Sequence, residues 1–322
     1  MTITILGPGA VGTLLGGLLQ ASGSTVTLRG RRAPPPRGEP LRVLLPGAWL
    51  LVEGLRSEGP EDPVGNPDLF VVTLGRHHLH AVRRPDFLRM IGDIAPVAFC
   101  NADLAQADRL AVPSHRHLRL LTLWNAVKLQ ETEVELTTVQ PAIIVERHPQ
   151  LLDAVQAVAA HGIRVIPVDD ARPYGNSLFL YQLLFLPVAM CNTTLEAFLS
   201  VPEGRELALR VLQEGFAAAE RASLPVTRLP VQDPWELASR LEKRPTGFDT
   251  ERHLPGRGYN SVLQSFLLDR PSEAAQLNRR IVEIASDAGL HLTWNWRLFQ
   301  KASRITSVGY FRDPAELLQA LV

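Results

Sequence analysis

The pattern of hydrophobic and polar positions changes character about halfway along the chain. In the first half, short apolar runs alternate with segments of helical periodicity, as in residues 2–6 followed by residues 11–21. This alternation predicts parallel strands joined by helices, and the almost wholly apolar run over 69–74 is typical of a strand buried on both faces. The first half therefore predicts an α/β domain with a doubly wound, mostly parallel sheet.

The same pattern predicts the other elements of the first half. A helix is expected over 151–160, and Pro46-Gly47 between two apolar runs predicts a hairpin over 41–45 and 49–55. Residues 32–40 and 56–67 carry many turn-forming residues and are expected to be loops. The remaining strands are expected over 24–29, 97–100, 118–124, 142–145 and 163–168.

The second half shows helical periodicity and almost no strand-like runs. A polar connection over 169–176 separates the halves, so we expect a domain over 1–168 and an all-α domain over 169–322. The helices are expected over 177–199, 203–222, 232–242, 259–269, 271–288 and 295–302.

A glycine-rich turn joins the first strand to the first helix. In Gly7-x-Gly9-x-x-Gly12, the first glycine permits a tight turn, the second a close approach of a pyrophosphate, and the third close packing of helix on strand. The helix N-terminus offers free N–H groups to phosphates. The motif predicts a Rossmann nucleotide site, or else a glycine-rich turn in another α/β fold. The residues assigned to the cofactor are Gly7, Pro8, Gly9, Ala10, Val11 and Gly12.

Composition excludes several classes of function. The chain has 322 residues and no formal net charge, so nothing favours a nucleic acid or an anionic membrane surface as a partner. The longest apolar stretch, 178–191, is too short to span a bilayer and contains Pro187. Cys100 and Cys191 lie in apolar runs, which indicates buried free thiols. We therefore expect a cytoplasmic protein.

The end of the second strand bears on the choice of cofactor. An NAD site carries an acidic residue there, whereas this chain has Arg29-Gly30-Arg31-Arg32, and arginine suits a 2′-phosphate. We therefore expect NADP, with Arg31 as its first ligand and Arg29 as its second. The alternative is a solvated arginine loop, because only three of the 33 basic residues are lysines.

Motifs in the second half point to a family. Ser261-Val-Leu-Gln264 resembles S-M-x-Q-D, and Glu273, twelve residues after the serine, lies in a segment similar to G-R-x-T-E. Asn278 matches the asparagine of N-G, residues 289–295 resemble G-x-x-x-P-x-N, and Asn101 matches an asparagine in Q-N-G-x-G. With the glycine turn, these motifs resemble ketopantoate reductase (2-dehydropantoate 2-reductase) over nearly the whole chain.

The resemblance implies that a hydride passes from NADPH to the ketone carbon of a small 2-oxo acid. It assigns Glu273 to orientation of the proton donor and contact with the substrate hydroxyl, Ser261 to the substrate carboxylate, and Asn101 to the vicinity of the nicotinamide. Leu74 and Gly75 belong to the cofactor site, and the helical domain to the substrate and to a homodimer contact.

Each of these residues also has a purely structural interpretation. Ser261 could cap a helix over 262–269, Glu273 could be a first-turn acid with Ser272 as the cap, and Asn101 could simply end a strand. The joint spacing of the three favours the functional interpretation.

The chain departs from the family at its general acid. The family has a lysine in W-x-K-L-x-x-N, whereas 177–192 contains no lysine and the position falls on Gln182 or Leu184. A second family lysine is replaced by Gly75. Gln182 can donate a hydrogen bond but cannot deliver a proton, and Tyr181 would need a pKa well below 10.

Three hypotheses follow from this departure. The first is an NADP-dependent reductase with altered chemistry that uses Tyr181 or Gln182. The second is a catalytically inactive NADP(H)-binding protein of the same fold. The third is a hydroxyacid- or opine-type dehydrogenase whose acid is one of three histidines after the strand over 69–74: His77, His78 and His80.

Overall fold

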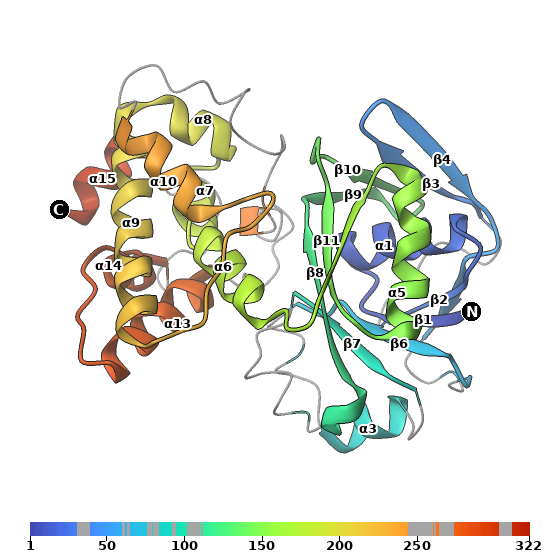
Figure 1. The fold of residues 1–322 in the computed structure, drawn as a ribbon. Helices are drawn as coiled ribbons and strands as arrows, with labels where there is room; N and C mark the ends of the chain where they lie inside the picture. Colours follow the sequence, from blue (N-terminus) through green and yellow to red (C-terminus); the bar gives the residue numbers. More distant parts are fainter. Residues whose placement is uncertain are drawn as a thin grey trace. The chain divides into compact units, whose positions relative to one another are not determined.

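The chain forms two compact units, Met1–Ala171 and Arg172–Val322, in a computed structural model (Figure 1). The change from strands to helices was expected after residue 168. The structure describes all residues except 31–38, 60, 61, 63, 64, 76–78, 80–83, 92–94, 102–109, 111, 244–259, 261, 264–273 and 303–310.

The first unit is built on a large sheet in which every neighbouring pair of strands is parallel except β8 and β11. This confirms the predicted mostly parallel α/β fold. The short strand β5 lies in a segment that was expected to be loop. In spatial order the strands are β12 (Arg164–Val168), β11 (Ala142–Glu146), β8 (His117–Leu123), β7 (Val97–Cys100), β6 (Leu69–Val72), β1 (Thr2–Leu6), β2 (Thr25–Arg29) and β5 (Arg56–Glu58).

The order of the strands reverses at β1. The chain passes from β1 to β2 on one side and later returns to β6 on the other side of β1. In open α/β sheets, ligands bind at the carboxyl ends of the strands where the order reverses in this way. The glycine turn follows β1 directly, so it lies at this switch point.

A second sheet covers the first helix, α1 (Ala10–Ala21). It contains the predicted hairpin, β3 (Leu41–Leu45) and β4 (Ala48–Val52), together with two strands that the sequence analysis missed, β10 (Glu133–Leu136) and β9 (Ala126–Gln130). A Cβ atom on Gly16 would lie 2.7 Å from Leu28 of the large sheet, and one on Gly17 2.7 Å from Val43 of the second sheet. These two glycines let α1 pack closely between both sheets.

Two further α-helices belong to the described part of the first unit. They are α3 (Arg84–Ile91) and α5 (Pro149–Gln156). The second corresponds to the helix expected over 151–160, and a short 3₁₀ segment, Ala157–His161, continues it.

The described residues of the second unit form helices around the long helix α9 (Pro202–Arg221). None of the described helices is long and apolar enough to cross a membrane. The C-terminal helix α15 was not expected from the sequence. The other helices are α6 (Arg172–Gln182), α7 (Phe185–Met190), α8 (Leu195–Ser200), α10 (Pro234–Lys243), α13 (Ala274–Asp287), α14 (Trp294–Ala302) and α15 (Pro314–Leu321).

The helix expected over 177–199 is broken into α6, α7 and α8. Pro187 has no N–H, so it cannot bond the carbonyl of Leu183 four residues earlier. The side-chain amide of Asn278, on α13, donates to this carbonyl at 3.5 Å instead. The break is therefore a structured feature of the core, held from another helix.

Glu214 of α9 holds the N-terminus of α14. Its Oε1 accepts hydrogen bonds from the backbone N–H groups of Thr293 and Trp294 at 2.6 and 2.8 Å. Its Oε2 accepts from the backbone N–H and the side-chain amide of Asn295 at 2.9 and 3.0 Å. A carboxylate that accepts four hydrogen bonds at a helix N-terminus is stabilised by the helix dipole as well.

We predict that Glu214→Gln lowers the free energy of unfolding by about 2–4 kcal/mol, because an amide NH₂ would face donors at one of the two oxygen positions. The matched control is Glu206→Gln on the same helix, whose carboxylate forms an exposed ion pair with Arg210. That control should change stability by less than about 0.5 kcal/mol. Thermal and urea unfolding measure both, and equal losses would contradict the capping role.

Candidate dinucleotide-binding site

The turn after β1 requires glycine at its first position. Gly7 has a φ of +104°, a conformation that residues with a Cβ rarely adopt. Its N–H donates to the carbonyl of Arg29 at 3.0 Å, and its own carbonyl accepts from Gly9 at 2.8 Å. These bonds turn the chain sharply from the strand into α1.

Gly12 is the point of closest packing in the site. A Cβ atom at Gly12 would lie 2.2 Å from the Gly7 carbonyl oxygen and 2.4 Å from Oγ1 of Thr73. The Thr73 hydroxyl donates to the same carbonyl at 2.6 Å, so it ties the end of β6 to the turn. Sequence reasoning missed Thr73, although a hydroxyl residue at the carboxyl end of an apolar strand was an available signal.

Gly9, unlike Gly12, has open space where a side chain would be. It is exposed and forms the N-cap of α1, which has no side-chain cap and no acidic residue in its first turn. A Cβ atom there would meet no atom within 4 Å. The first backbone N–H groups of a helix have no partner within it, so α1 offers donors and a positive dipole end beside open space. These residues fit the pyrophosphate of a dinucleotide.

Leu74 lies beside the turn, and Gly75 follows it in the chain. The backbone N and Cδ2 of Leu74 are both 3.0 Å from the position of a Cβ on Gly7. The carbonyl of Gly75 accepts from the N–H of Leu79 at 2.9 Å. His77, His78 and His80 lie outside the described residues.

The expected role of Arg29 needs correction. Its side chain is 3% exposed, and its guanidinium forms an ion pair with Glu58 at 2.9 Å and donates to the carbonyl of Asp62. The guanidinium therefore fastens β5 and the following loop to β2, and it is not an available cation for a 2′-phosphate. Arg31, the first choice, lies outside the described residues, so the expectation of NADP depends on Arg31.

Asn101 occupies the carboxyl end of β7 in a left-handed conformation, with a φ of 53°. Its side-chain amide donates to Oγ1 of Thr122 at 2.7 Å, and its Oδ1 accepts from the N–H of Thr122 at 2.8 Å. The asparagine thus has a structural role at the strand end. An asparagine amide has a second N–H and further lone pairs, so these bonds do not exclude a ligand.

Ser261 and Glu273 lie outside the described residues, but the neighbour of Ser261 is informative. Oδ1 of Asn260 accepts from the N–H groups of Val262 and Leu263, both at 3.0 Å. Its amide also donates to the carbonyl of Phe185 on α7 at 3.3 Å. Asn260 therefore provides the helix cap that was considered as an alternative role for Ser261.

Tyr181 does not have the surroundings of a proton donor. It is buried in the core of the helical unit, where its ring meets Phe185 edge to face with centroids 6.1 Å apart. Burial, and secondarily the charge of Glu196, raise its pKa, whereas acid catalysis near neutrality needs a lower one. Tyr181 is therefore a core residue, which corrects the expectation.

The two positions that could match the family lysine differ in environment. Gln182 ends α6 and is half-buried, whereas Leu184 is fully buried in the helical core. Only Gln182 can present a polar group. No cation or acid of the described residues replaces the lysine in this stretch of chain.

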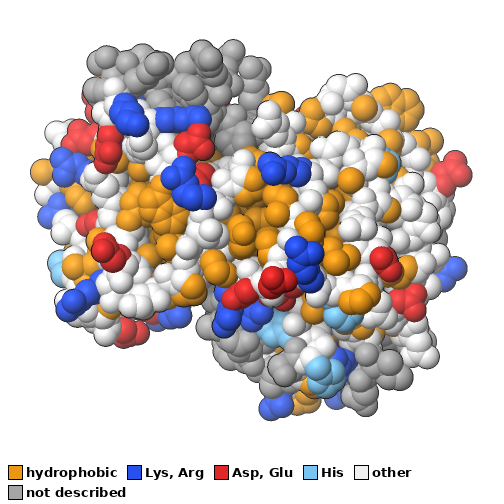
Figure 2. Space-filling view, in the orientation of Figure 1, with side chains coloured by type: hydrophobic (Ala, Val, Ile, Leu, Met, Phe, Trp, Pro, Cys, Tyr) orange, Lys and Arg blue, Asp and Glu red, His pale blue; other side chains and the backbone are white. Residues whose placement is uncertain are grey.

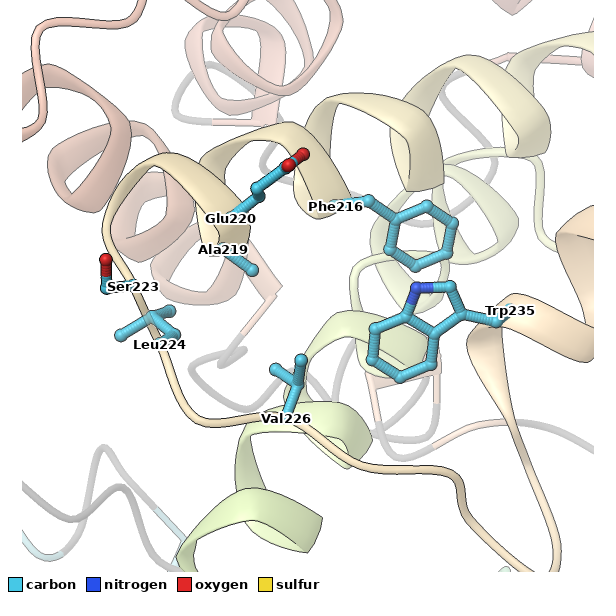
Figure 3. A pocket seen from close by; sticks show the side chains of 7 residues that line it. All are labelled: Phe216, Ala219, Glu220, Ser223, Leu224, Val226 and Trp235. Carbon is cyan, nitrogen blue, oxygen red and sulfur yellow. The ribbon is translucent and has the colours of Figure 1, made fainter.

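The helical unit also has a surface hollow of about 400 Å³ between α9, α10 and the segment before α10 (Figure 3). Phe216 and Trp235 stack on one side, with ring centroids 5.0 Å apart. The rest is lined by Ala219, Glu220, Ser223, Leu224 and Val226, so none of the predicted site residues that the structure describes contributes to it.

The fold and the glycine turn define a class: proteins with a Rossmann dinucleotide-binding unit followed by a helical unit. Residues 3–150 match the family described as ketopantoate reductase PanE/ApbA. This match over the N-terminal unit confirms the predicted resemblance. A search of the curated proteins by sequence found no match.

Solved structures share the fold over most of the chain. A 2-dehydropantoate 2-reductase from Geobacter metallireducens has 18% sequence identity and a TM-score of 0.76, covering 94% of this chain and 99% of that chain. D-mandelate dehydrogenase with NADH and anilino(oxo)acetate has 16% identity and a TM-score of 0.75, with 94% and 98% covered. A dimeric ketopantoate reductase from Staphylococcus aureus has 17% identity and a TM-score of 0.70, again with 94% and 98% covered.

Two substitutions separate binding from folding at the turn. We predict that Gly9→Ala leaves the unfolding temperature almost unchanged but weakens NADPH and NADH binding at least about tenfold, because its methyl group enters the space beside the helix N-terminus. Gly12→Ala should instead destabilise the protein by about 1–3 kcal/mol, because the methyl group meets the Gly7 carbonyl and Thr73.

Fluorescence titration with each dinucleotide and thermal unfolding measure the two effects. The matched control is Gly65→Ala, because Gly65 has no positive φ, an added Cβ there also meets no atom within 4 Å, and the residue lies before β6, away from the turn. Unchanged dinucleotide affinity in Gly9→Ala would show that the pyrophosphate does not lie on this turn.

Proposed function

We propose that this protein is an NADP-dependent oxidoreductase that reduces a small 2-oxo acid or a related carbonyl, with chemistry altered from that of ketopantoate reductase. The observation that carries the proposal is the open space at Gly9, next to an uncapped helix N-terminus at the switch point of the sheet. The family match over residues 3–150 supports it.

The N–H groups of the first turn of α1 would hold the pyrophosphate, and Arg31 would hold the 2′-phosphate. The bound dinucleotide supplies hydride chemistry. Asn101, fixed by Thr122, would lie near the nicotinamide, while Ser261 would hold the substrate carboxylate and Glu273 would contact its hydroxyl. These roles follow from the family resemblance.

Gln182 would supply the remaining interaction with the substrate. Negative charge develops on the carbonyl oxygen during reduction, and the Gln182 amide can donate a hydrogen bond to it. It cannot transfer a proton, and loss of a general acid typically costs about 10²–10⁴ in rate. We therefore expect slow turnover, with water as the source of the proton.

Similar structures support the remaining parts of the proposal. The D-mandelate dehydrogenase was solved with NADH and anilino(oxo)acetate, whose oxo and carboxylate groups resemble those of a 2-oxo acid. The Staphylococcus aureus protein is a dimer, which supports a homodimer here. The two cysteines are free and buried, as suits a protein of the reducing cytoplasm.

A catalytically inactive dinucleotide-binding protein is the second candidate. The burial of two residues considered for the proton donor or its position favours this candidate. Leu184 is fully buried, and Tyr181 belongs to the hydrophobic core. The chain has no lysine between Lys128 and Lys243. This candidate keeps the glycine turn and predicts binding without turnover.

Absorbance of NADPH and of NADH, followed with a panel of 2-oxo acids, distinguishes the two candidates. We expect consumption of NADPH with at least one 2-oxo acid, about 10²–10⁴ more slowly than in a lysine-containing ketopantoate reductase measured alongside. Arg31→Ala should then raise the KM for NADPH with little effect on that for NADH. Tight binding of the dinucleotide without turnover on any substrate would favour the inactive protein.

Restoring a cation gives a second test. We predict that Gln182→Lys raises the rate of carbonyl reduction at least about tenfold, since an ammonium group can stabilise the developing oxyanion and donate a proton. Leu184→Lys is the matched comparison at the other possible position. It should destabilise the protein by about 3–5 kcal/mol, because it buries a charge in the core. A higher rate of reduction in a stably folded Leu184→Lys variant would show that position 184, and not position 182, corresponds to the family lysine.

A further inference from the structure

Three neighbouring strands, β1, β2 and β5, end side by side at the edge of the large sheet that carries the glycine turn. The N–H of Gly7, after β1, donates to the carbonyl of Arg29, the last residue of β2, at 3.0 Å. The N–H of Gly30 donates in turn to the carbonyl of Glu58, the last residue of β5, at 3.2 Å. Arg29 and Glu58 are direct partners in the parallel register of β2 and β5. Glu58 therefore lies at the same edge as the glycine turn, one strand beyond β2.

The ion pair between Arg29 and Glu58 presents its negative end to solvent. The side chain of Arg29 is 3% exposed, whereas that of Glu58 is 29% exposed. Oε2 of Glu58 accepts from the guanidinium at 2.9 Å, and Oε1 has no hydrogen-bond partner in the described part of the chain. An ionised carboxylate can accept several hydrogen bonds, so Oε1 is available to a ligand. The accessible group at the end of β2 is thus a carboxylate that the neighbouring strand supplies.

A second carboxylate follows in the segment after β5. Oδ2 of Asp62 accepts from the N–H of Gly59 at 2.7 Å, and the carbonyl of Asp62 accepts from the Arg29 guanidinium. The segment therefore folds around Arg29 and brings two carboxylates to one cation. The local charge at the ends of β2 and β5 is negative, and a phosphate is repelled there.

Long-range electrostatics favours neither NADPH nor NADH. On the face that Figure 2 shows, acidic and basic side chains are interspersed and neither kind gathers into a broad patch. The whole chain has no formal net charge. A general attraction for anions therefore does little to favour NADPH, which has one phosphate more than NADH. The choice depends on the groups close to the adenosine ribose.

We propose that Glu58 is a specificity-determining residue for the cofactor, whose carboxylate binds the adenosine 2′-hydroxyl of NADH and disfavours the 2′-phosphate of NADPH. NAD sites carry such a carboxylate at the end of the second strand. In this chain the second strand ends in Arg29, which holds the carboxylate of Glu58 beside it.

This inference rests on the proposed function, in which the glycine turn holds the pyrophosphate and Arg31 the 2′-phosphate. Arg31 and Glu58 then act in opposite directions on the choice of cofactor. We therefore expect the protein to bind NADH with an affinity within about tenfold of that for NADPH. A site with an arginine alone would favour NADPH more strongly.

Titration of the full chain with NADPH and with NADH, followed by nicotinamide fluorescence, tests the role of Glu58. Glu58→Gln should bind NADPH at least about tenfold more tightly, because a carboxylate is removed from beside a phosphate. It should bind NADH about three- to tenfold more weakly, because an amide oxygen is a weaker acceptor than a carboxylate. Glu58→Asp keeps the charge and should still discriminate against NADPH.

Glu133→Gln is the matched control for the loss of an ion pair. The Glu133 side chain is 21% exposed and pairs with Arg42 at 3.2 Å, but it belongs to the second sheet. This variant should bind both dinucleotides as the unmodified protein does. Thermal unfolding of all three variants shows whether each is folded at the temperature of the titration.

Two further ligand comparisons use the unmodified protein and do not depend on the folding of any variant. An NADH analogue with 2′-deoxyadenosine cannot donate to Glu58, so it should bind about tenfold more weakly than NADH. ADP-ribose and its 2′-phosphate lack the nicotinamide. Their ratio of affinities should equal that of NADH and NADPH, because the discrimination arises at the ribose.

The outcomes separate this inference from the proposed function. If both dinucleotides bind and Glu58→Gln leaves their ratio of affinities unchanged, Glu58 does not select the cofactor, whereas the proposed function stands. Equal binding of NADH and its 2′-deoxy analogue, or an equal change of the ratio in Glu133→Gln, overturns the inference in the same way. If the unmodified protein binds neither dinucleotide, the proposed function fails and the role of Glu58 fails with it.

Discussion

The structure of the N-terminal unit depends on how closely α1 approaches the strand that precedes it. No Cβ atom fits between Gly12 and the Gly7 carbonyl, and Thr73 fixes that carbonyl from the next strand. This close contact aims the helix N-terminus at the carboxyl end of β1. Because α1 is also covered by the second sheet, with Gly16 and Gly17 permitting contact on both sides, the helix cannot tilt without loss of two packed interfaces. The site therefore derives its geometry from buried packing.

The preference of the chain for arginine has structural consequences that bear on cofactor choice. Arg116 donates twice to the carbonyl of Ala95, and Arg205 donates to the carbonyls of Leu199 and Ser200; both are buried. Arg29 belongs with them, since it binds Glu58 and the loop at Asp62. The planar guanidinium satisfies several oxygens at once, which a lysine cannot do. An arginine near a phosphate site is thus weak support for phosphate binding until its partners are known.

Sequence reasoning succeeded where a single strong signal decides the structure. The central strands β6 and β7 are apolar throughout, and the glycine turn has a fixed pattern, so both were predicted. The strands β9 and β10 were missed because they are short and half-exposed, and pairing with β3 and packing on α1 make them strands. The role of Arg29 was wrong because its partner Glu58 is 29 residues away. By contrast, α15 begins with the recognisable cap Asp313 followed by Pro314, a signal that was present and overlooked.

The break after α6 is held by residues other than Gln182. The absence of a lysine at that position therefore affects the chemistry of the proposed site and not the folding of the helix. Since α6 ends at Gln182, that position lies at a helix C-terminus, where the dipole favours a positive charge. The bond from Asn278 to the Leu183 carbonyl and the bond from Asn260 to the Phe185 carbonyl keep the break in place without help from residue 182. Asn278 is itself bonded to Asn295, and Asn295 to Glu214, so the break is anchored to the same network that begins α14. A lysine at position 182 would therefore be tolerated by this fold. On the proposed correspondence of Gln182 to the family lysine, glutamine at this position removes a proton donor while the surrounding network stays intact.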